Sequence, residues 1–183
     1  WGGLPVPLRC GKGAEVKATL FYQEIDDLIE FVTLTVYPEY TGQYRTSEGT
    51  SRSSGIALSG SLPLSDRVRL NGALTYTHTK ASDGDQLARV PETDLRIGLD
   101  ADLTDRLAAG ISVHAVRNLF DERANVLIPM RDYETVDATV KYDLGQEAQI
   151  YLRAENLLDE DYQVVEGFGT SGRAFHVGLR KSF

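Results

Sequence analysis

The sequence has little cysteine, no long apolar run and little positive charge, and each of these features excludes a class of protein or site. It contains a single cysteine, Cys10, which excludes a disulfide framework and a cysteine-based zinc site. No apolar run approaches the roughly 18–20 residues that a membrane helix needs. Positive charge is also scarce, because 27 acidic residues outnumber 19 basic ones and leave a net charge of −8. This balance argues against a nucleic-acid partner, which a basic face would usually mark.

Catalytic and metal-binding patterns are missing as well. His78, His114 and His176 are the only histidines, and no two of them have a metal-ligand spacing such as HxxxH. No GxSxG nucleophile elbow occurs. The acidic residues Asp137 and Glu155 are predicted to form ion pairs with basic neighbours rather than to perform acid–base chemistry. We therefore expect no enzyme, no catalytic or metal site and no cofactor.

What the sequence has in abundance is alternation of apolar and polar residues with a period of two. Eight stretches between residues 14 and 183 show it, as in residues 95–103, where every odd-numbered residue is apolar. None of the intervening segments has helical periodicity, so the chain is predicted to be all-β. Residues 1–13 show no period and are expected to form an irregular segment of unclear origin. Residues 26–43 are expected to be a long connection with a short strand near 31–36.

Three short turns, at residues 65–67, 104–106 and 145–147, predict three antiparallel hairpins whose apolar faces stay in register. The predicted pairs are Leu62–Leu70, Leu58–Leu74, Ile56–Tyr76, Leu99–Ile111, Ile97–Val113, Tyr142–Ile150, Val140–Leu152 and Leu144–Ala148. Long loops are predicted at the opposite ends of the strands, at residues 26–43, 80–90, 117–132 and 158–173. An up-and-down meander with one tight rim and one rim of long loops is typical of outer-membrane barrels.

The alternation alone does not show which face contacts water. A soluble barrel has an apolar interior and a polar exterior, whereas a membrane barrel has the reverse arrangement. The polar rows favour a water-filled lumen, since they carry Lys17, Arg69, Arg96, Asp100, Asp102, Asp137, Lys141, Arg153, Glu155 and Arg180. Tyr22, Tyr76 and Tyr142 stand near strand ends in the apolar rows, as in an interfacial aromatic belt. We predict an antiparallel up-and-down transmembrane β-barrel, with about eight strands present and outer-membrane lipid outside.

The C-terminal stretch resembles the end of TonB-dependent outer-membrane receptors, which typically close with an ENLxDxxY…GR-x-F…GLxxxF sequence. The motif residues are Asn156, Leu157, Asp159, Tyr162, Gly172, Arg173, Phe175, Gly178 and Phe183. A looser likeness extends upstream through residues 44–58 and the RVP at 89–91. Lys181 departs from the pattern, because an aromatic residue commonly alternates with the terminal Phe.

The resemblance implies a barrel of about 22 strands with a separate N-terminal plug domain. Residues 14–183 would be the C-terminal third of its wall, in the outer membrane of a Gram-negative bacterium. It implies energy-coupled uptake of a scarce nutrient chelate, with ferric siderophore as the first candidate and cobalamin or a glycan as alternatives. The TonB complex would act through the plug, which this sequence lacks, and the barrel-assembly machinery would recognise the last strand. Because the sequence begins with Trp1 rather than Met, we expect a fragment or a processed product.

Ligand recognition in such a receptor would use the outer loops and the upper lumen. The candidate ligand-binding residues are Tyr37, Tyr40, Tyr44, Phe120, Arg123, Arg131 and Phe168. The alternative for each is an ordinary loop residue that packs against its neighbours. Two other functions remain open at this point: a self-contained eight-stranded outer-membrane barrel with a structural or adhesion role, and, less favoured, a soluble ligand-binding β-barrel.

Overall fold

The computed structural model describes residues 2–10 and 13–181, and these form two antiparallel sheets. The larger sheet has nine strands in the order β1-β2-β3-β4-β5-β6-β9-β10-β11. Their bounds are β1 (Gly2–Cys10), β2 (Ala14–Thr35), β3 (Thr41–Pro63), β4 (Val68–Lys80), β5 (Thr93–Asp102), β6 (Leu107–Arg117), β9 (Tyr133–Gly145), β10 (Ala148–Glu155) and β11 (Ala174–Lys181). The smaller sheet is a hairpin of β7 (Phe120–Arg123) and β8 (Val126–Pro129). The prediction of an all-β, antiparallel fold is confirmed.

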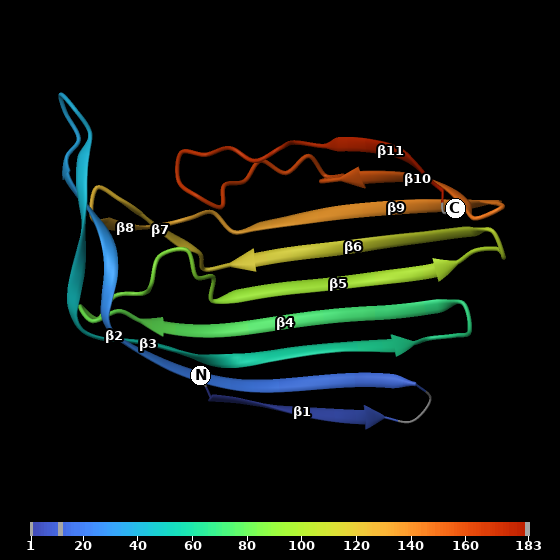
Figure 1. Cartoon of the computed structure of the whole chain (residues 1–183), viewed down its shortest axis with the longest axis horizontal. Helices are drawn as coiled ribbons and strands as arrows, with labels where there is room; N and C mark the ends of the chain where they lie inside the picture. The colour runs from blue at the N-terminus through green and yellow to red at the C-terminus, as the bar shows by residue number, and fades with distance from the viewer. Residues whose placement is uncertain (1, 11–12, 182–183) are drawn as a thin grey trace.

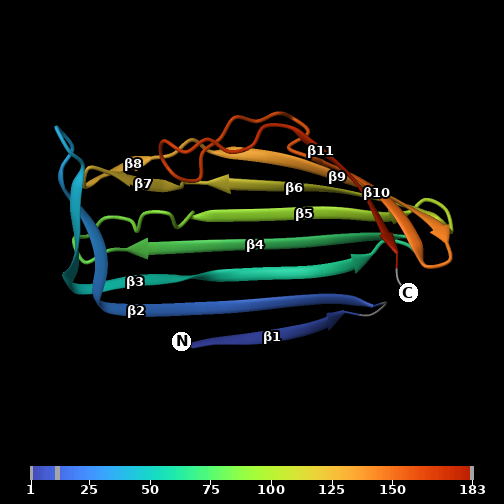
Figure 2. The ribbon, with the colours of Figure 1, turned by 45° about the horizontal axis from the view of Figure 1, so that its top comes forward.

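The nine strands form a curved wall with tight turns at one end and long connections at the other (Figures 1 and 2). Consecutive strands of the main sheet are neighbours throughout, apart from the β7–β8 hairpin inserted between β6 and β9. Within the described residues β1 and β11 each have one neighbour, so the sheet is open rather than closed. In the described part of the chain there is also no helix long and apolar enough to cross a membrane.

The registers predicted for the three hairpins are confirmed with one exception. The observed pairs include Leu62–Leu70, Leu58–Leu74, Ile56–Tyr76, Leu99–Ile111, Ile97–Val113, Tyr142–Ile150 and Val140–Leu152. The predicted pairing of Leu144 with Ala148 is wrong, because Ala148 lies opposite Gly145. Gln146 and Glu147 have φ values of 53° and 59°, which suit a two-residue hairpin turn, and an irregularity after Ala148 then restores the register.

The expectation that residues 1–13 are irregular is corrected by β1, which pairs with β2 along its full length. The register places three apolar positions opposite three others, in the pairs Leu4–Leu20, Val6–Ala18 and Leu8–Val16. Pro5 and Pro7 obscured this alternation in the sequence. A proline has no N–H to donate, so it is tolerated in an edge strand, and β1 is an edge of the sheet.

The long connection expected at residues 26–43 is also corrected, because β2 and β3 remain paired as far as Thr35 and Thr41. We call residues 28–47 the β2–β3 extension. Its register shifts between Asp26 and Leu28, where Asp27 has a φ of 55°. Three steps along β3, from Thr50 to Ser47, lie opposite two steps along β2, so β3 carries one extra residue at this point. The regular pairing is interrupted there, which is why a strict period of two ends there in the sequence. The extension turns across the loop ends of the other strands (Figure 1).

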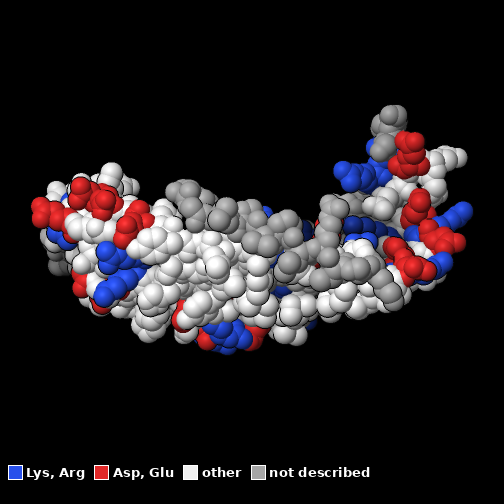
Figure 3. All heavy atoms as spheres, turned by 90° about the horizontal axis from the view of Figure 1, so that it is seen from below, with Lys and Arg blue, Asp and Glu red and all other residues white. Residues whose placement is uncertain are grey.

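The two faces of the sheet differ as the alternation predicted. Apolar residues such as Ile97 and Leu152 are 44% and 46% exposed on one face, a degree of exposure that suits lipid. The other face is polar and holds a hollow of about 640 Å³ whose lining includes Asn71, Asp100, Asp137, Lys141 and Arg153. Figure 3 shows charged side chains gathered mainly at the two ends of the strands, with most of the surface between them uncharged.

Ion pairing among the polar residues of the wall was predicted for Asp137 and Glu155, and the structure bears out one of the two. The Glu155 carboxylate lies 2.9 Å from a guanidinium nitrogen of Arg153. Asp137 instead accepts a hydrogen bond of 2.9 Å from the backbone N–H of Asn156. A carboxylate of β9 therefore holds the start of the last loop.

Candidate functional site

Asp121, at the start of the β7–β8 hairpin, joins three loops at the outer end of the wall. Its side chain is 1% exposed. One carboxylate oxygen accepts hydrogen bonds from Arg89 Nε at 2.7 Å and from the Glu122 N–H at 2.8 Å, and the other accepts from the Glu166 N–H at 2.7 Å. Burial acts to raise the pKa of Asp121, but the hydrogen bonds from Glu166 and Arg89 outweigh it and lower the pKa. The ionised carboxylate is therefore the form that this site favours.

The tip of the same hairpin contacts the β2–β3 extension. Asn125 Oδ1 accepts a hydrogen bond from the Thr33 N–H at 2.8 Å, and Asn125 Nδ2 donates one to the Thr33 carbonyl at 2.7 Å. Ala124 and Asn125 both have positive φ, as a two-residue hairpin turn requires. The Asn125 carboxamide therefore takes the place of a neighbouring strand for Thr33. We call this pair of bonds the Asn125–Thr33 bridge.

These contacts enclose an outer cavity of about 1000 Å³ between the β2–β3 extension, the β7–β8 hairpin and the loop before β11. Its lining is Ile29, Glu30, Phe31, Thr33, Val36, Tyr40, Tyr44, Ala88, Arg89, Asp121, Glu122, Arg123, Ala124, Val165, Glu166, Gly167 and Phe168. Three of the aromatic rings touch one another. The Phe31 ring lies edge-on to Tyr44 with centroids 5.3 Å apart, and it stacks on Tyr40 at 6.4 Å.

Each arginine of this lining is engaged with a carboxylate of the lining. Arg89 is bound to Asp121, and Arg123 lies 3.5 Å from Glu166. Burial, followed by the negative charges of Glu30 and Asp121, raises the pKa of Glu122. The outer cavity is therefore aromatic and, counted over its lining, has more negative than positive groups.

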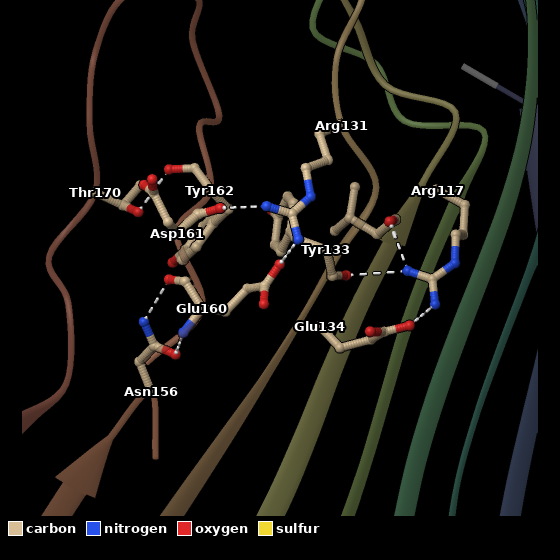
Figure 4. Close-up of polar contacts among 10 residues, drawn as sticks. Arg117, Arg131, Tyr133, Glu134, Asn156, Glu160, Asp161, Tyr162 and Thr170 are labelled. Atoms are coloured by element: carbon tan, nitrogen blue, oxygen red, sulfur yellow. Dashed lines mark hydrogen bonds and ion pairs between the residues drawn. The ribbon is translucent and has the colours of Figure 1, made fainter. Parts of the chain in front are cut away.

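Asn156, the first residue of the C-terminal motif, organises the last loop. Its side-chain oxygen accepts from the Glu160 N–H at 2.9 Å, while its Nδ2 donates to the Glu160 carbonyl at 2.9 Å and to the Ser171 carbonyl at 3.5 Å. Figure 4 shows the two contacts with Glu160 beside the end of β10. Asn156 is buried and has a φ of 49°, a conformation that asparagine adopts more readily than most residues. The motif residue thus has a folding role.

Asp159, Gly172 and Arg173 hold the return of the same loop. Asp159 accepts a hydrogen bond of 2.8 Å from the Arg173 N–H and forms an ion pair of 3.6 Å with its guanidinium. The backbone hydrogen bond from Arg173 lowers the pKa of Asp159. A Cβ at Gly172 would lie 3.0 Å from Asp159 Oδ1, so a side chain there would crowd this contact.

The other motif residues pack or pair around this loop. Tyr162 stacks on Tyr133 with centroids 4.2 Å apart, against a small core that includes Val116 and Leu119. Leu157 continues the backbone pairing, because its N–H donates to the Val136 carbonyl at 2.7 Å. The remaining residues lie on the last strand, where Phe175 is exposed on the apolar face and Gly178 lies under the Tyr151 ring. Phe183 lies outside the described residues.

Comparison with known proteins assigns the chain to a family. The model of the family described as TonB dependent receptor-like, beta-barrel matches residues 11–157. The chain belongs to this family. Membership agrees with the open antiparallel wall and places the chain in the outer membrane of a Gram-negative bacterium. The soluble barrel that the sequence left open is thereby set aside.

Several known proteins resemble this chain along most of the chain's length. It is 26% identical over 189 residues to the iron-regulated outer membrane virulence protein of Vibrio cholerae serotype O1, covering 94% of this chain and 29% of that protein. The copper transporter OprC superposes with a TM-score of 0.78 at 18% identity, over 97% of this chain and 30% of that one. The siderophore receptor PirA from Acinetobacter baumannii gives 0.79 at 16% identity, over 99% and 31%. The chain therefore spans about three tenths of the length of these relatives.

Four of the seven predicted ligand-binding residues of this receptor segment line the outer cavity: Tyr40, Tyr44, Arg123 and Phe168. The other three lie elsewhere. Tyr37 is 88% exposed at the tip of the β2–β3 extension, and Phe120 is paired with Pro129 in the β7–β8 hairpin. Arg131 forms an ion pair of 2.8 Å with Glu160 and donates to the Asp161 carbonyl at 3.3 Å (Figure 4).

Sequence reasoning missed several residues that define the outer cavity, above all Phe31, Asp121 and Glu122. The sequence predicts only a short strand near Phe31, within a long connection, and not the β2–β3 extension that positions this ring. Asp121 and Glu122 lie in a segment predicted to be a loop, and acidic loop residues usually face solvent. The one available signal was the RVP at 89–91, which marked the loop whose Arg89 binds Asp121.

Proposed function

We propose that this chain is the C-terminal wall of a TonB-dependent receptor that binds a scarce nutrient chelate at its outer end. A ferric siderophore is the proposed ligand, and energy from the inner-membrane TonB complex would drive it through the barrel. The wall corresponds to residues 14–183 together with β1, and the plug domain would lie in another part of the same protein. The role is transport rather than catalysis. The barrel-assembly machinery would act on the last strand, β11.

The observation that carries this proposal is the outer cavity, which lies at the loop end of the wall. The wall itself has an apolar face that suits lipid and a polar face on its other side. About 1000 Å³ is at the upper end of what small-molecule sites occupy, and an iron chelate is a large ligand. The cavity is lined by aromatic rings of the β2–β3 extension and by Phe168 of the loop before β11. These rings offer a ligand apolar contact area with little loss of side-chain entropy. Four of the residues expected from the sequence to bind ligand are among them.

Uptake of iron-55 by cells tests the proposal. The full-length receptor would be expressed in a Gram-negative host that lacks its own siderophore receptors, and a panel of iron-55 siderophores would be supplied under iron limitation. We expect receptor-dependent accumulation of at least one chelate, and its loss when the host's TonB protein is deleted. Uptake that is the same with and without the receptor, across hydroxamate, catecholate and carboxylate chelates, would reject iron transport.

A further inference from the structure

The outer cavity carries information about the charge of its ligand. Resting on the proposed function, we infer that the cavity selects a chelate that bears a positive group or no net charge, and disfavours an anionic chelate.

The lining contains four carboxylates, from Glu30, Asp121, Glu122 and Glu166, against two arginines, Arg89 and Arg123. Asp121 and Arg89 neutralise each other at 2.7 Å, and this contact is bound into the loop backbone. Arg123 is paired with Glu166 at 3.5 Å. An anionic ligand that recruited either arginine would leave a carboxylate without its partner, and for the buried Asp121 that loss is costly.

Two carboxylates, Glu30 and Glu122, have no ion-pair partner within the cavity lining. Glu30 has a long contact of 3.6 Å with Arg45, an exposed residue that is not part of the lining. Glu122 takes part in none of the ion pairs formed by the residues that the structure describes. Burial raises the pKa of Glu122 most, and the negative charges of Glu30 and Asp121 raise it further because these carboxylates repel one another. A cation entering the outer cavity would relieve this repulsion, and an anion would add to it.

The aromatic residues of the lining point to the same chemistry. Phe31, Tyr40 and Tyr44 form one group of rings on the β2–β3 extension. Phe168 enters from the loop before β11 and is 70% exposed, so its ring is free to meet a ligand. The negative faces of aromatic rings attract ammonium and guanidinium groups, and nearby carboxylates reinforce this attraction. Rings and carboxylates that have no partner within the lining together make a site for an organic cation attached to an apolar or neutral body.

A series of three ferric trihydroxamates tests the inference at constant shape. Ferric desferrioxamine B carries a free ammonium group, its N-acetyl derivative is neutral at that position, and its N-succinyl derivative is anionic. Binding to the full-length receptor in nanodiscs would be measured by isothermal titration calorimetry at low ionic strength. We expect affinity to fall from the ammonium to the acetyl to the succinyl complex, by about 3- to 10-fold across the series. The spread should shrink at high salt, because these charges are partly exposed.

Variants connect the effect to Glu30 and Glu122, the two carboxylates that have no partner within the lining. The double substitution Glu30→Gln and Glu122→Gln should bring the three affinities within about 2-fold of one another, chiefly by weakening the ammonium complex. Glu147→Gln, in the turn between β9 and β10 at the opposite end of the wall, is the matched control and should leave the spread unchanged.

The outcomes separate this inference from the proposed function. Equal affinities for the three complexes, or tightest binding of the succinyl complex, would overturn charge selection while leaving siderophore binding intact. A spread that persists in the double variant would also overturn it, because the selectivity would then arise elsewhere. If none of the three complexes binds, the inference is rejected for hydroxamates, and the iron-55 uptake panel decides separately whether the receptor transports iron at all.

Discussion

The carboxamide of Asn125 is hydrogen-bonded to both the N–H and the carbonyl of Thr33, which lies 92 residues earlier in the chain. This bridge connects the β7–β8 hairpin to the β2–β3 extension across the outer cavity. Both groups are exposed, so the bridge is a contact that can open without unfolding the wall. The bridge therefore determines how firmly the β2–β3 extension is held against the β7–β8 hairpin.

Asn125→Ala should loosen the β2–β3 extension. Two exposed hydrogen bonds contribute about 1–2 kcal/mol at the low end of their usual range, so local opening should rise by about 5- to 30-fold. Hydrogen exchange measured by mass spectrometry should show faster exchange for residues 28–47 and little change in β4 to β6. Asn125→Asp is the graded control, because it keeps the acceptor for the Thr33 N–H but loses the donor. Unchanged exchange in Asn125→Ala would show that the bridge does not hold the extension.

Asp121→Asn should release the three loops from one another. The amide retains the size of the carboxylate but has no charge, so Arg89 loses its ionic partner. One of the two oxygens becomes an NH₂ group, and when that group faces the Glu166 N–H, two donors meet. Because Arg89 is 60% exposed, water can replace part of what it loses, and the substitution should cost about 1.5–3 kcal/mol locally. Limited proteolysis should cut the loops at residues 80–92 and 158–173 much faster than in the parent protein. Asp66→Asn, at an exposed turn on the opposite rim, should leave the cleavage pattern unchanged.

Acid should have the same effect on the parent protein. The pKa of Asp121 is lower in the folded state than in the unfolded chain, so its contribution to loop stability is fully present above the unfolded pKa of about 4. That contribution is lost as the pH falls through the folded pKa, when the carboxylate takes up a proton. An acid-active protease should therefore cleave the loops increasingly below about pH 4, while the Asp121→Asn variant shows a flatter pH profile. Parallel profiles for the two proteins would contradict this assignment.

Asn156→Ala should destabilise the last loop through the loss of its side-chain bonds to Glu160 and Ser171. A buried, multiply bonded asparagine contributes about 2–3 kcal/mol, and the positive φ at this position adds strain for alanine. Thermal unfolding in detergent, followed by the mobility shift on gels, should show a lower midpoint. Asn71→Ala removes a single exposed hydrogen bond to Asp100 on the inner wall and should change the midpoint by much less.

Gly178→Ala should weaken the final hairpin by about 1 kcal/mol. A Cβ at Gly178 would lie 2.4 Å from the end of the Tyr151 ring, which would have to swing away from the strand that it covers. Adding Tyr151→Ala should remove the clash, so the double variant should tolerate Gly178→Ala with no further loss relative to Tyr151→Ala alone. Gly169→Ala, which meets nothing within 4 Å, is the control for adding a methyl group. Folding yield in detergent measures all four proteins, and additive losses in the double variant would contradict the contact.

The sequence by itself determined the strand faces and most of the registers of the wall. Pairs such as Leu99–Ile111 could be predicted because a slip of one residue would place every apolar side chain on the polar face. The motif that runs from Asn156 to Phe183 also points to the receptor family from the sequence alone. The structure adds what part of this motif does: Asn156, Asp159 and Arg173 bond to one another's backbone or to the loop that they enclose.

Only the tertiary structure decided the β2–β3 extension and the outer cavity. One extra residue in β3, opposite Asp27, interrupts the regular pairing, so the alternation before it does not predict the strands that continue beyond it. The contacts of Asp121 and Asn125 join segments that are distant in sequence, and no short-range period records which loop residues meet. Alternation encodes which face a residue occupies, because each position depends on its immediate neighbours. The cavity depends on how separate loops close over one end of the wall, and that is a property of the assembled fold.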